Sequence, residues 1–361
     1  MPDPLYLGLI SGTSLDGIDV ALIRRHATGI ELLSAATVAY PPPLRQRLLI
    51  DRHERPLTAR ELGSLDVAVG KAFGAAANHL LADYNLAPAA VRAIGSHGQT
   101  ILHHPELGFS LQIGDPARIA RITGITTVAD FRRADLAAGG EGAPLAPALH
   151  RFLFGADESR AILNLGGIAN LTLLIPGQPV VAFDVGPANT LLDALARIST
   201  GNGCDRDGRL AGRGRVDSDL LGRLLDDPWF RRPPPKSTGP EYFNLHWLRT
   251  HMASRKIADP DLAATLCELT AASVAAALVP HPKALYCCGG GVHNPVLMRR
   301  LAVHLPATKV LSTAALGYDP DYIEAICFAW LAGERLSLTP ANLPEVTGAE
   351  GSAVLGAVYV G

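Results

Sequence analysis

The chain has 361 residues, a length that favours two domains, and its composition of 48% hydrophobic and 18% charged residues is globular rather than disordered. A formal net charge of −2 gives no electrostatic footprint for nucleic acid. The five cysteines form no CxxC pair and no Cys/His metal spacing, which argues against a zinc site.

The first predicted elements are strands followed by a long helix. Apolar runs on both sides of a glycine turn predict a hairpin over residues 5–25, and a third strand is expected near 32–39. Residues 58–84 have helical periodicity, with Thr58 as the expected N-cap and Glu61 at the capping-box position.

Short strands are expected in the next part of the chain, at 91–95, 110–113 and 126–129. Between the last two, Asp115 or Pro116 begins a short helix that extends to about Thr123. Short strands that alternate with helices predict an α/β fold with a largely parallel sheet. Ligands bind beyond the carboxyl ends of the strands in such sheets, and polar residues follow each of these strands.

A stretch rich in glycine and proline at 139–147 is the best candidate for a junction between two halves. It gives domains 1–138 and 139–361, and the final residues of the chain are allowed to pack back onto the first domain. The pattern then restarts with a second hairpin at 161–175, so the two halves are expected to be related. The later predicted elements are a strand at 180–183, helices at 190–198 and 261–279, a strand at 284–288, and helices at 294–304 and 320–336.

Three glycine turns are candidates for binding phosphate, because glycine-rich backbone accompanied by hydroxyls and amides can surround phosphate oxygens. They lie at 12–16, 166–167 and 289–291, each next to a predicted strand. A tight turn that binds nothing remains the alternative for any one of them. The sequence has no GxxxxGK[ST] motif and no GxGxxG after a strand, which argues against a P-loop NTPase and a Rossmann dehydrogenase.

The main candidate for acid–base chemistry is Asp184, which directly follows the apolar residues 180–183. A carboxylate in that position can act as a general base, although a helix cap or a turn former is the alternative. Asp16 could orient a metal or a water, and the alternative is again a turn, because Asp-Gly is a favoured turn pair.

The remaining candidates are polar residues for a sugar or a carboxylate. Ser96, His97 and Gln99 can hydrogen-bond a sugar. Arg132 and Arg133 can pair with a substrate carboxylate, and solvated surface is their alternative. Glu324 lies on a predicted helix, where a solvated face is the simpler interpretation.

Taken together, these segments resemble the anhydro-N-acetylmuramic acid kinases over essentially the whole chain. The motifs that carry the resemblance are 8–19, 96–100, 111–115, 128–132, 164–170, 183–189, 235–239, 288–291 and 324–331. Any one of these motifs is weak, whereas nine in order are specific. Two positions depart from the family pattern: Val185 stands where threonine is usual, and Ala188 where glycine is usual.

The resemblance implies the actin-like, sugar-kinase ATPase fold, with two RNase-H-like domains around a central cleft. It also implies that Mg²⁺ and ATP phosphorylate O6 of 1,6-anhydro-N-acetylmuramic acid while water opens the anhydro bridge at C1. The products are N-acetylmuramic acid 6-phosphate and ADP, in the recycling of cell-wall murein. A homodimer is implied as well.

The resemblance further implies a role for each candidate residue. Asp184 takes the proton of the attacking water. The β- and γ-phosphates are held by Gly12, Thr13, Ser14, Leu15, Asp16, Gly17, Ile18 and Asp19, with Gly166 and Gly167 as a second phosphate loop. The adenosine side is assigned to Gly289, Gly290, Gly291 and Asn294. The sugar contacts are Ser96, His97, Gln99 and Glu324, with Arg132 on the lactyl carboxylate.

Other classes of protein are less consistent with the sequence. A kinase of the same fold acting on another sugar or on a small carboxylic acid is the alternative enzyme. A sugar-sensing regulator would carry a DNA-binding helix-turn-helix, and a chaperone-like or filament ATPase would need a partner-binding domain or insertions. The N-terminal residues lack the features of a secretion signal, and the apolar stretch at 271–280 is too short to span a bilayer. We therefore expect a cytoplasmic protein that binds neither membranes nor nucleic acid.

Overall fold

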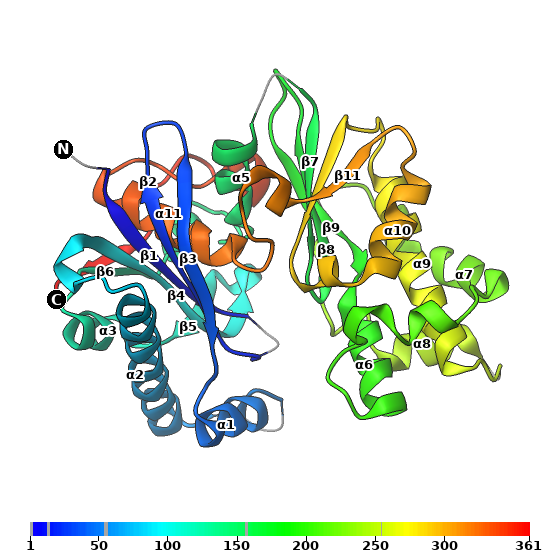
Figure 1. The fold of residues 1–361 in the computed structure, drawn as a ribbon, viewed down its shortest axis with the longest axis horizontal. Coiled ribbons are helices and arrows are strands. Elements are labelled where there is room, and N and C mark those ends of the chain that lie inside the picture. Colours follow the sequence, from blue (N-terminus) through cyan, green and yellow to red (C-terminus); the bar gives the residue numbers. More distant parts are fainter. Residues whose placement is uncertain (1–2, 13–14, 54–56, 156–157, 254) are drawn as a thin grey trace. The chain divides into compact units, whose positions relative to one another are not determined.

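The computed structural model describes residues 3–12, 15–53, 57–155, 158–253 and 255–361 (Figure 1). Packing divides the chain into two compact units. Unit 1 comprises Met1–Leu153 and Tyr322–Gly361, and unit 2 comprises Phe154–Asp321. The sequence placed the domain boundary at residue 139, whereas packing assigns residues 139–153 to unit 1.

Unit 1 contains a mixed sheet in the order β12-β6-β4-β1-β2-β3, with β5 paired to β4. Antiparallel pairing joins β1 to β2 and β2 to β3, whereas β4 is parallel to both β1 and β6. The strands are β1 (Leu5–Ser11), β2 (Ile18–Arg25), β3 (Ile30–Val38), β4 (Val91–His104), β5 (Phe109–Ile113), β6 (Thr127–Ala129) and β12 (Ala357–Tyr359).

Helices cover both faces of this sheet. Leu7 and Leu9 of β1 belong to the same buried cluster as Phe73 of α2. The intervening Gly8 faces α11, because a Cβ at Gly8 would lie 1.7 Å from the carbonyl oxygen of Ala325. The helices of unit 1 are α1 (Pro42–His53), α2 (Ala59–Asp83), α3 (Pro116–Thr123), α4 (Arg133–Ala137), α5 (Ala146–Phe154), α11 (Ile323–Leu336) and α12 (Pro344–Thr347).

Unit 2 repeats this strand order with fewer strands. Its sheet runs β11-β10-β7-β8-β9, with β7-β8 and β8-β9 antiparallel and β10 parallel to both β7 and β11. The strands are β7 (Arg160–Leu165), β8 (Ile168–Leu174), β9 (Val181–Pro187), β10 (Ala284–Cys288) and β11 (Lys309–Ser312). The helices are α6 (Asn189–Thr200), α7 (Ser218–Leu225), α8 (Leu245–Met252), α9 (Asp259–Ala277) and α10 (Pro295–His304).

The two sheets therefore share one topology. In each, three strands form an antiparallel meander, and two further strands are added in parallel beside the first strand of the meander. This is the RNase-H-like order, so the predicted repeat of two related halves is confirmed. The expectation of a largely parallel sheet was wrong, because each meander and the strands β5 and β12 contribute antiparallel pairs.

Two strands are longer than the sequence indicated. β4 continues through the polar residues 96–100 to His104, because β5 pairs antiparallel with its second half. β9 continues past Phe183 to Pro187, so Asp184 lies within a strand rather than after one. Among the helices of the described part of the chain, none has the length and apolar character needed to cross a membrane.

Candidate active site

Asp184 is the main candidate for a functional carboxylate in unit 2. On the neighbouring strand Asn170 is its register partner, and the Asn170 side-chain amide donates to Asp184 Oδ1. The other oxygen, Oδ2, accepts hydrogen bonds from the Thr238 amide at 2.8 Å and from Ser237 Oγ at 3.2 Å. The backbone amide of Asp184 donates to the carbonyl oxygen of Lys236 at 3.0 Å. We call residues 236–238, which hold both the backbone and the carboxylate of Asp184, the capping segment.

The surroundings of Asp184 set two opposing influences on its pKa. Burial raises the pKa above its ordinary value, and the carboxylate of Glu241 adds to that increase. The hydrogen bonds from Thr238, Asn170 and Ser237 act in the opposite direction, because they stabilise the ionised form. The net shift is upward, which moves the carboxyl toward the pH at which a general base works best.

The pH dependence of catalysis should therefore respond to Asn170. Replacing Asn170 with alanine removes one donor to the ionised carboxylate, so the pKa of Asp184 should rise further. A base must be deprotonated, so activity is lost as the pH falls through this pKa. We expect the acid limb of kcat/KM against pH to move to higher pH in Asn170→Ala. A limb that stays in place or moves to lower pH would contradict this assignment.

The turn at Gly166 and Gly167, between β7 and β8, is fastened to the start of α6. The carbonyl oxygen of Gly166 accepts from the backbone amide of Asn189, and that of Gly167 accepts from Thr190, both at 3.0 Å. A Cβ at Gly167 would lie 2.7 Å from Thr190 Oγ1, so glycine permits this close approach. These two amides of α6 are therefore already hydrogen-bonded to the turn and are not available to bind an anion.

The glycine run at 289–291 follows β10, as the sequence predicted. Gly289 has a φ of 78°, and a Cβ there would lie 2.4 Å from Asn164 Oδ1. Asn294 is buried and caps α10, with its Oδ1 accepting from the amides of Val296 and Leu297 at 3.0 and 3.2 Å. The structure thus gives Asn294 a capping role, and its contact with a nucleoside stays a prediction.

The first glycine turn connects β1 and β2. Leu15 and Ile18 are buried, so any contribution they make to a phosphate site is through their backbone. Asp16 is exposed, and Asp19 is half-buried with its Oδ1 accepting from Thr37 Oγ1 at 2.6 Å. A Cβ at Gly17 would lie 2.5 Å from Thr37 Cγ2. Thr13 and Ser14 lie outside the described residues, and the carbonyl of Gly12 accepts from the Leu15 amide at 3.3 Å.

His97 and Arg132 form a connected pair in unit 1. Arg132 donates from Nη2 and Nε to His97 Nε2, at 2.8 and 3.2 Å, and from Nη1 to the carbonyl of Gly142 at 2.8 Å. A guanidinium can only donate, so Nε2 of His97 accepts and Nδ1–H donates to the carbonyl of Gly98 at 3.0 Å. Burial and the charge of Arg132 hold the pKa of His97 well below its usual value, which agrees with a neutral ring.

Glu324 lies in the first turn of α11, with its side chain exposed to solvent. Its pKa is raised, chiefly because protein atoms crowd around it and also because of the Asp19 carboxylate, while Arg132 acts in the opposite direction. Glu324, Asp19 and Arg132 are therefore electrostatically coupled within unit 1. The sequence assigned Asp19 to the ATP phosphates, Glu324 to the sugar and Arg132 to the lactyl carboxylate, so this coupling links the three predicted contacts.

Two further predicted residues carry buried polar atoms that find no partner in the part of the chain that the structure describes. Ser96 and Gln99 are each 1% exposed, and neither Ser96 Oγ nor Gln99 Oε1 has a hydrogen-bond partner among the described residues. Gln99 Nε2 donates to the carbonyl of Gly12 at 3.4 Å, which links the sugar candidates to the first glycine turn. Buried polar atoms normally find a partner, so these two atoms suit a ligand or a bound water.

A cavity of about 410 Å³ in unit 1 borders Ser96 and His97. Such a volume lies within the range of small-molecule sites. Its polar lining includes Asp66, Ser96, Ser110, Gln112, Asp130 and Arg133. Arg132, Gln99 and Glu324 do not line it. Of the predicted sugar residues, Ser96 and His97 therefore border this cavity, and Arg132 is joined to it through its hydrogen bonds to His97.

Several site residues were not singled out from the sequence. Asn170, Ser237 and Thr238 hold the carboxylate of Asp184, and Gln112, Asp130 and Asp66 line the cavity. Most lie inside motifs that carried the family resemblance, which was the available signal. Their roles depend on which strand or loop packs beside them, and no spacing rule reveals that.

The fold and the site together define a class. One sheet topology repeated in two units, with a glycine turn after the first strand of each, is the organisation of actin-like ATPases, a class that includes sugar kinases. A hydrogen-bonded carboxylate of raised pKa on the last strand of the second meander supplies a candidate base within it.

The comparisons with known proteins are more specific. The family model described as anhydro-N-acetylmuramic acid kinase matches residues 4–361, and the chain belongs to this family of phosphotransferases. It is 52% identical to the anhydro-N-acetylmuramic acid kinase of Xylella fastidiosa (strain Temecula1 / ATCC 700964), over 99% of this chain and 97% of that protein. It is 47% identical to that of Coxiella burnetii (strain Dugway 5J108-111), over 100% of this chain and 99% of that protein.

Among solved structures, the chain is similar to the activator of the 2-hydroxyisocaproyl-CoA dehydratase from Clostridium difficile with bound ADPNP. The TM-score is 0.45 and the identity 12%, over 92% of this chain and 96% of that chain.

Proposed function

We propose that this chain uses ATP and water to convert 1,6-anhydro-N-acetylmuramic acid into N-acetylmuramic acid 6-phosphate and ADP, a step in recycling cell-wall murein. Full-length relatives at 47 to 54% identity that carry the kinase name support the substrate. The observation in the structure that carries the mechanism is Asp184, a carboxylate of raised pKa held by three hydrogen-bond donors.

In the proposed reaction Asp184 removes a proton from the attacking water. The water oxygen bonds to C1 of the sugar, and the C1–O6 bond of the anhydro bridge breaks. O6 is thereby freed to bond to the γ-phosphorus of ATP, and the bond from that phosphorus to the β-γ bridging oxygen breaks to release ADP. Such catalysis depends mostly on positioning and on stabilising charge.

The glycine turns are the proposed phosphate and nucleoside contacts. The Gly12–Asp19 turn would hold the β- and γ-phosphates, Gly166 and Gly167 would form the second phosphate loop, and 289–291 would approach the adenosine. Mg²⁺ usually binds through one or two carboxylates together with substrate phosphates and water, rather than in an all-protein cage. Asp16 and Asp19 fit that donor set, and no group of three or more His, Cys, Asp or Glu that could hold a metal occurs among the described residues. The ion would neutralise phosphate charge.

The sugar contacts are proposed for unit 1. Ser96 and Gln99 offer buried oxygens that have no hydrogen-bond partner among the described residues, and Glu324 offers an exposed carboxyl of raised pKa. Arg132 already donates to His97 and Gly142, so the lactyl carboxylate would use its remaining N–H groups. The cavity that borders Ser96 is a second polar surface for the same substrate.

The proposal extends to a homodimer in the cytoplasm. The dimer rests on the likeness to the family, and light scattering of the purified protein tests it directly. The cytoplasmic location is supported by the five cysteines, none of which forms a disulfide in the part of the chain that the structure describes, as is usual in a reducing compartment.

The deciding experiment incubates the protein with Mg²⁺, ATP and 1,6-anhydro-N-acetylmuramic acid in ¹⁸O-labelled water. We expect a phosphorylated muramic acid with one heavy oxygen at C1, because ring opening and phosphoryl transfer are coupled. A product without the label would contradict attack by water. Turnover of ATP on another sugar or a small carboxylic acid, with none on the anhydro sugar, would keep the fold and overturn the substrate.

A further inference from the structure

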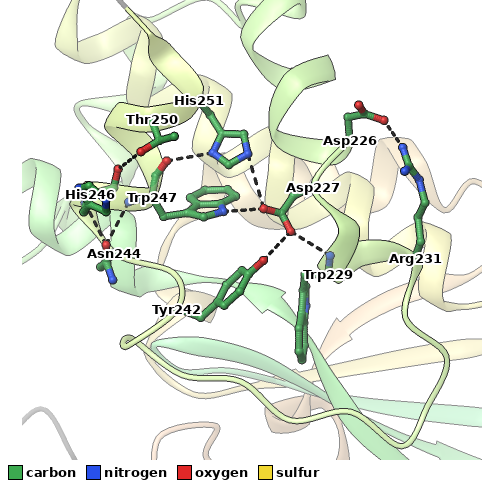
Figure 2. A network of polar contacts seen from close by, with 10 residues as sticks. All are labelled: Asp226, Asp227, Trp229, Arg231, Tyr242, Asn244, His246, Trp247, Thr250 and His251. Atoms are coloured by element: carbon green, nitrogen blue, oxygen red, sulfur yellow. Dashed lines mark hydrogen bonds and ion pairs between the residues drawn. The ribbon is translucent and has the colours of Figure 1, made fainter.

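Asp227 is a buried carboxylate of unit 2 that lies outside the site described above (Figure 2). It is 7% exposed and accepts three hydrogen bonds at ordinary distances. Its Oδ1 accepts from the Trp229 amide and from the Tyr242 hydroxyl, both at 2.9 Å, and its Oδ2 accepts from Trp247 Nε1 at 2.8 Å. The His251 ring lies beside the same oxygen, with Nε2 at 3.5 Å. Burial acts to raise the pKa of Asp227, but these donors hold it below its ordinary value.

The partners of Asp227 lie on both sides of the capping segment in the chain. Trp229 belongs to the short helix η5 (Pro228–Arg231), which precedes the segment. Tyr242 follows it, and Trp247 and His251 lie on α8. The Asp227 carboxylate therefore joins the residues before the capping segment to the residues after it.

The capping segment lies outside regular secondary structure and is held by contacts with Asp184 and Trp229. Residues 232–239 form no helix or strand, and Ser237 is exposed. Lys236 packs its ammonium over the Trp229 ring, 5.2 Å from the centroid, and donates to the Trp229 carbonyl at 3.4 Å. The conformation of the capping segment therefore depends on Trp229 before it and on Tyr242 and Trp247 after it. Asp227 accepts a hydrogen bond from each of these three residues.

Trp229 also reaches the strand that carries the proposed base. Its Nε1 donates to the carbonyl of Val185, the residue after Asp184, at 3.3 Å. Phe243, which is fully buried, packs against the Trp229, Tyr242 and Trp247 rings at centroid distances of 6.0, 4.9 and 5.0 Å. Asp227 thus anchors an aromatic cluster that touches both β9 and the capping segment.

We propose that Asp227 is a positioning residue for Asp184. It closes the loop that presents Ser237 Oγ and the Thr238 amide to the Asp184 carboxylate, and it fixes Trp229 against β9. It touches no reacting atom itself. The kinetic part of this inference rests on the proposed function, whereas its structural part does not.

The substitution Asp227→Asn tests the carboxylate with little change in volume. An amide has only one accepting oxygen, so it can face either Trp229 and Tyr242 or Trp247, and its NH₂ group then opposes a donor. The adjacent Asp226 supplies a matched control. It is exposed and pairs with Arg231 on the surface, so Asp226→Asn changes charge equally without touching the aromatic cluster.

The first readout is hydrogen exchange measured by mass spectrometry, which requires no activity. We expect peptides that contain residues 236–238 to exchange faster in Asp227→Asn than in the unchanged protein, while peptides from β7 and β10 keep their protection. Asp226→Asn should match the unchanged protein. If exchange at 236–238 is the same in both variants, Asp227 does not hold the capping segment and the inference is wrong.

The second readout separates turnover from nucleotide binding. A small misplacement of catalytic groups can cost up to about 100-fold in rate, so we expect kcat to fall roughly 10- to 100-fold in Asp227→Asn with the KM for ATP within about twofold. Equal losses in kcat and in ATP affinity would indicate general disruption of unit 2 and overturn the positioning role. Absence of kinase activity in the unchanged protein would count against the proposed function, and the exchange experiment would still decide this inference.

A second variant covers the case in which Asp227→Asn does not fold. Trp247→Phe removes one donor to Asp227 and keeps an aromatic ring beside Phe243. It should speed up hydrogen exchange at 236–238 and lower kcat, as Asp227→Asn does, but by smaller amounts. Normal exchange at 236–238 in a folded Trp247→Phe protein, together with unchanged kcat, would contradict the proposal.

Discussion

Asp184→Asn is expected to lower turnover by about 10²- to 10⁴-fold, the usual contribution of a positioned general base. The asparagine is isosteric, and its oxygen can still accept from Thr238 and Ser237 if the Asn170 amide turns over to present its own oxygen. The local structure should therefore persist while the proton acceptor is lost. The measurement is steady-state kcat with the anhydro sugar, together with calorimetric binding of ATP.

Glu241 provides the control for this experiment. It is an exposed carboxylate that acts on Asp184 only through its charge among the interactions described. Glu241→Gln should leave the plateau of kcat nearly unchanged and move the acid limb slightly to lower pH, because a charge that raises the pKa of Asp184 is removed. Near-normal turnover in Asp184→Asn would remove this residue from the mechanism. A large loss of ATP binding would instead assign it to the nucleotide site.

Gly8→Ala is expected to destabilise unit 1 by about 3 kcal/mol or more, at the upper end of overpacking effects. The added Cβ would lie 1.7 Å from the carbonyl oxygen of Ala325 and 2.8 Å from the amide nitrogen of Ala329. Both atoms belong to the backbone of α11, so relief requires the helix to move away from the sheet. For a unit of this size, that loss corresponds to a fall in Tm of about 6–12 °C. Calorimetric unfolding measures it.

Gly63→Ala is the matched comparison, because Gly63 lies inside α2 of the same unit and its added Cβ would have no described atom within 4 Å apart from its chain neighbours and the adjacent backbone of its own helix. Replacing a glycine within a helix by alanine should raise stability by about 0.5–1 kcal/mol. The two substitutions therefore have opposite expected signs. If Gly8→Ala left Tm unchanged, α11 would not lie against β1 as closely as described.

Local features of the fold followed well from the sequence. The N-cap at Thr58 with its Glu61 capping box is confirmed, and so is the start of α3, which begins at Pro116 with Asp115 as its N-cap. Both features depend on residues within a few positions of one another. The extents of β4 and β9 were underestimated. Polar residues such as Ser96 and Asp184 interrupt the apolar pattern, yet each stays in its strand because a neighbouring strand continues to pair with it.

The candidate site, like the fold, could be predicted from the sequence only in part. Asp184 could be singled out because an acidic residue follows an apolar run. The donors that hold it could not, since Ser237 and Thr238 reach it from an irregular loop more than fifty positions away. Asp227 gives no signal at all in sequence, because its role depends on aromatic partners brought together by the turn of the chain into α8.

The return of α11 to the first sheet has a consequence for synthesis on the ribosome. The face of β1 and β4 that carries Gly8 and Gly95 is covered by α11, residues 323–336. The segments of unit 1 are thus separated in the chain by unit 2, which is one continuous segment. At about 5–20 residues per second, the ribosome needs roughly 10–40 s to reach the end of α11 after residue 153. Throughout that interval the N-terminal strands expose an apolar surface that their own segment cannot cover. The nascent chain therefore keeps an uncovered apolar face until α11 emerges.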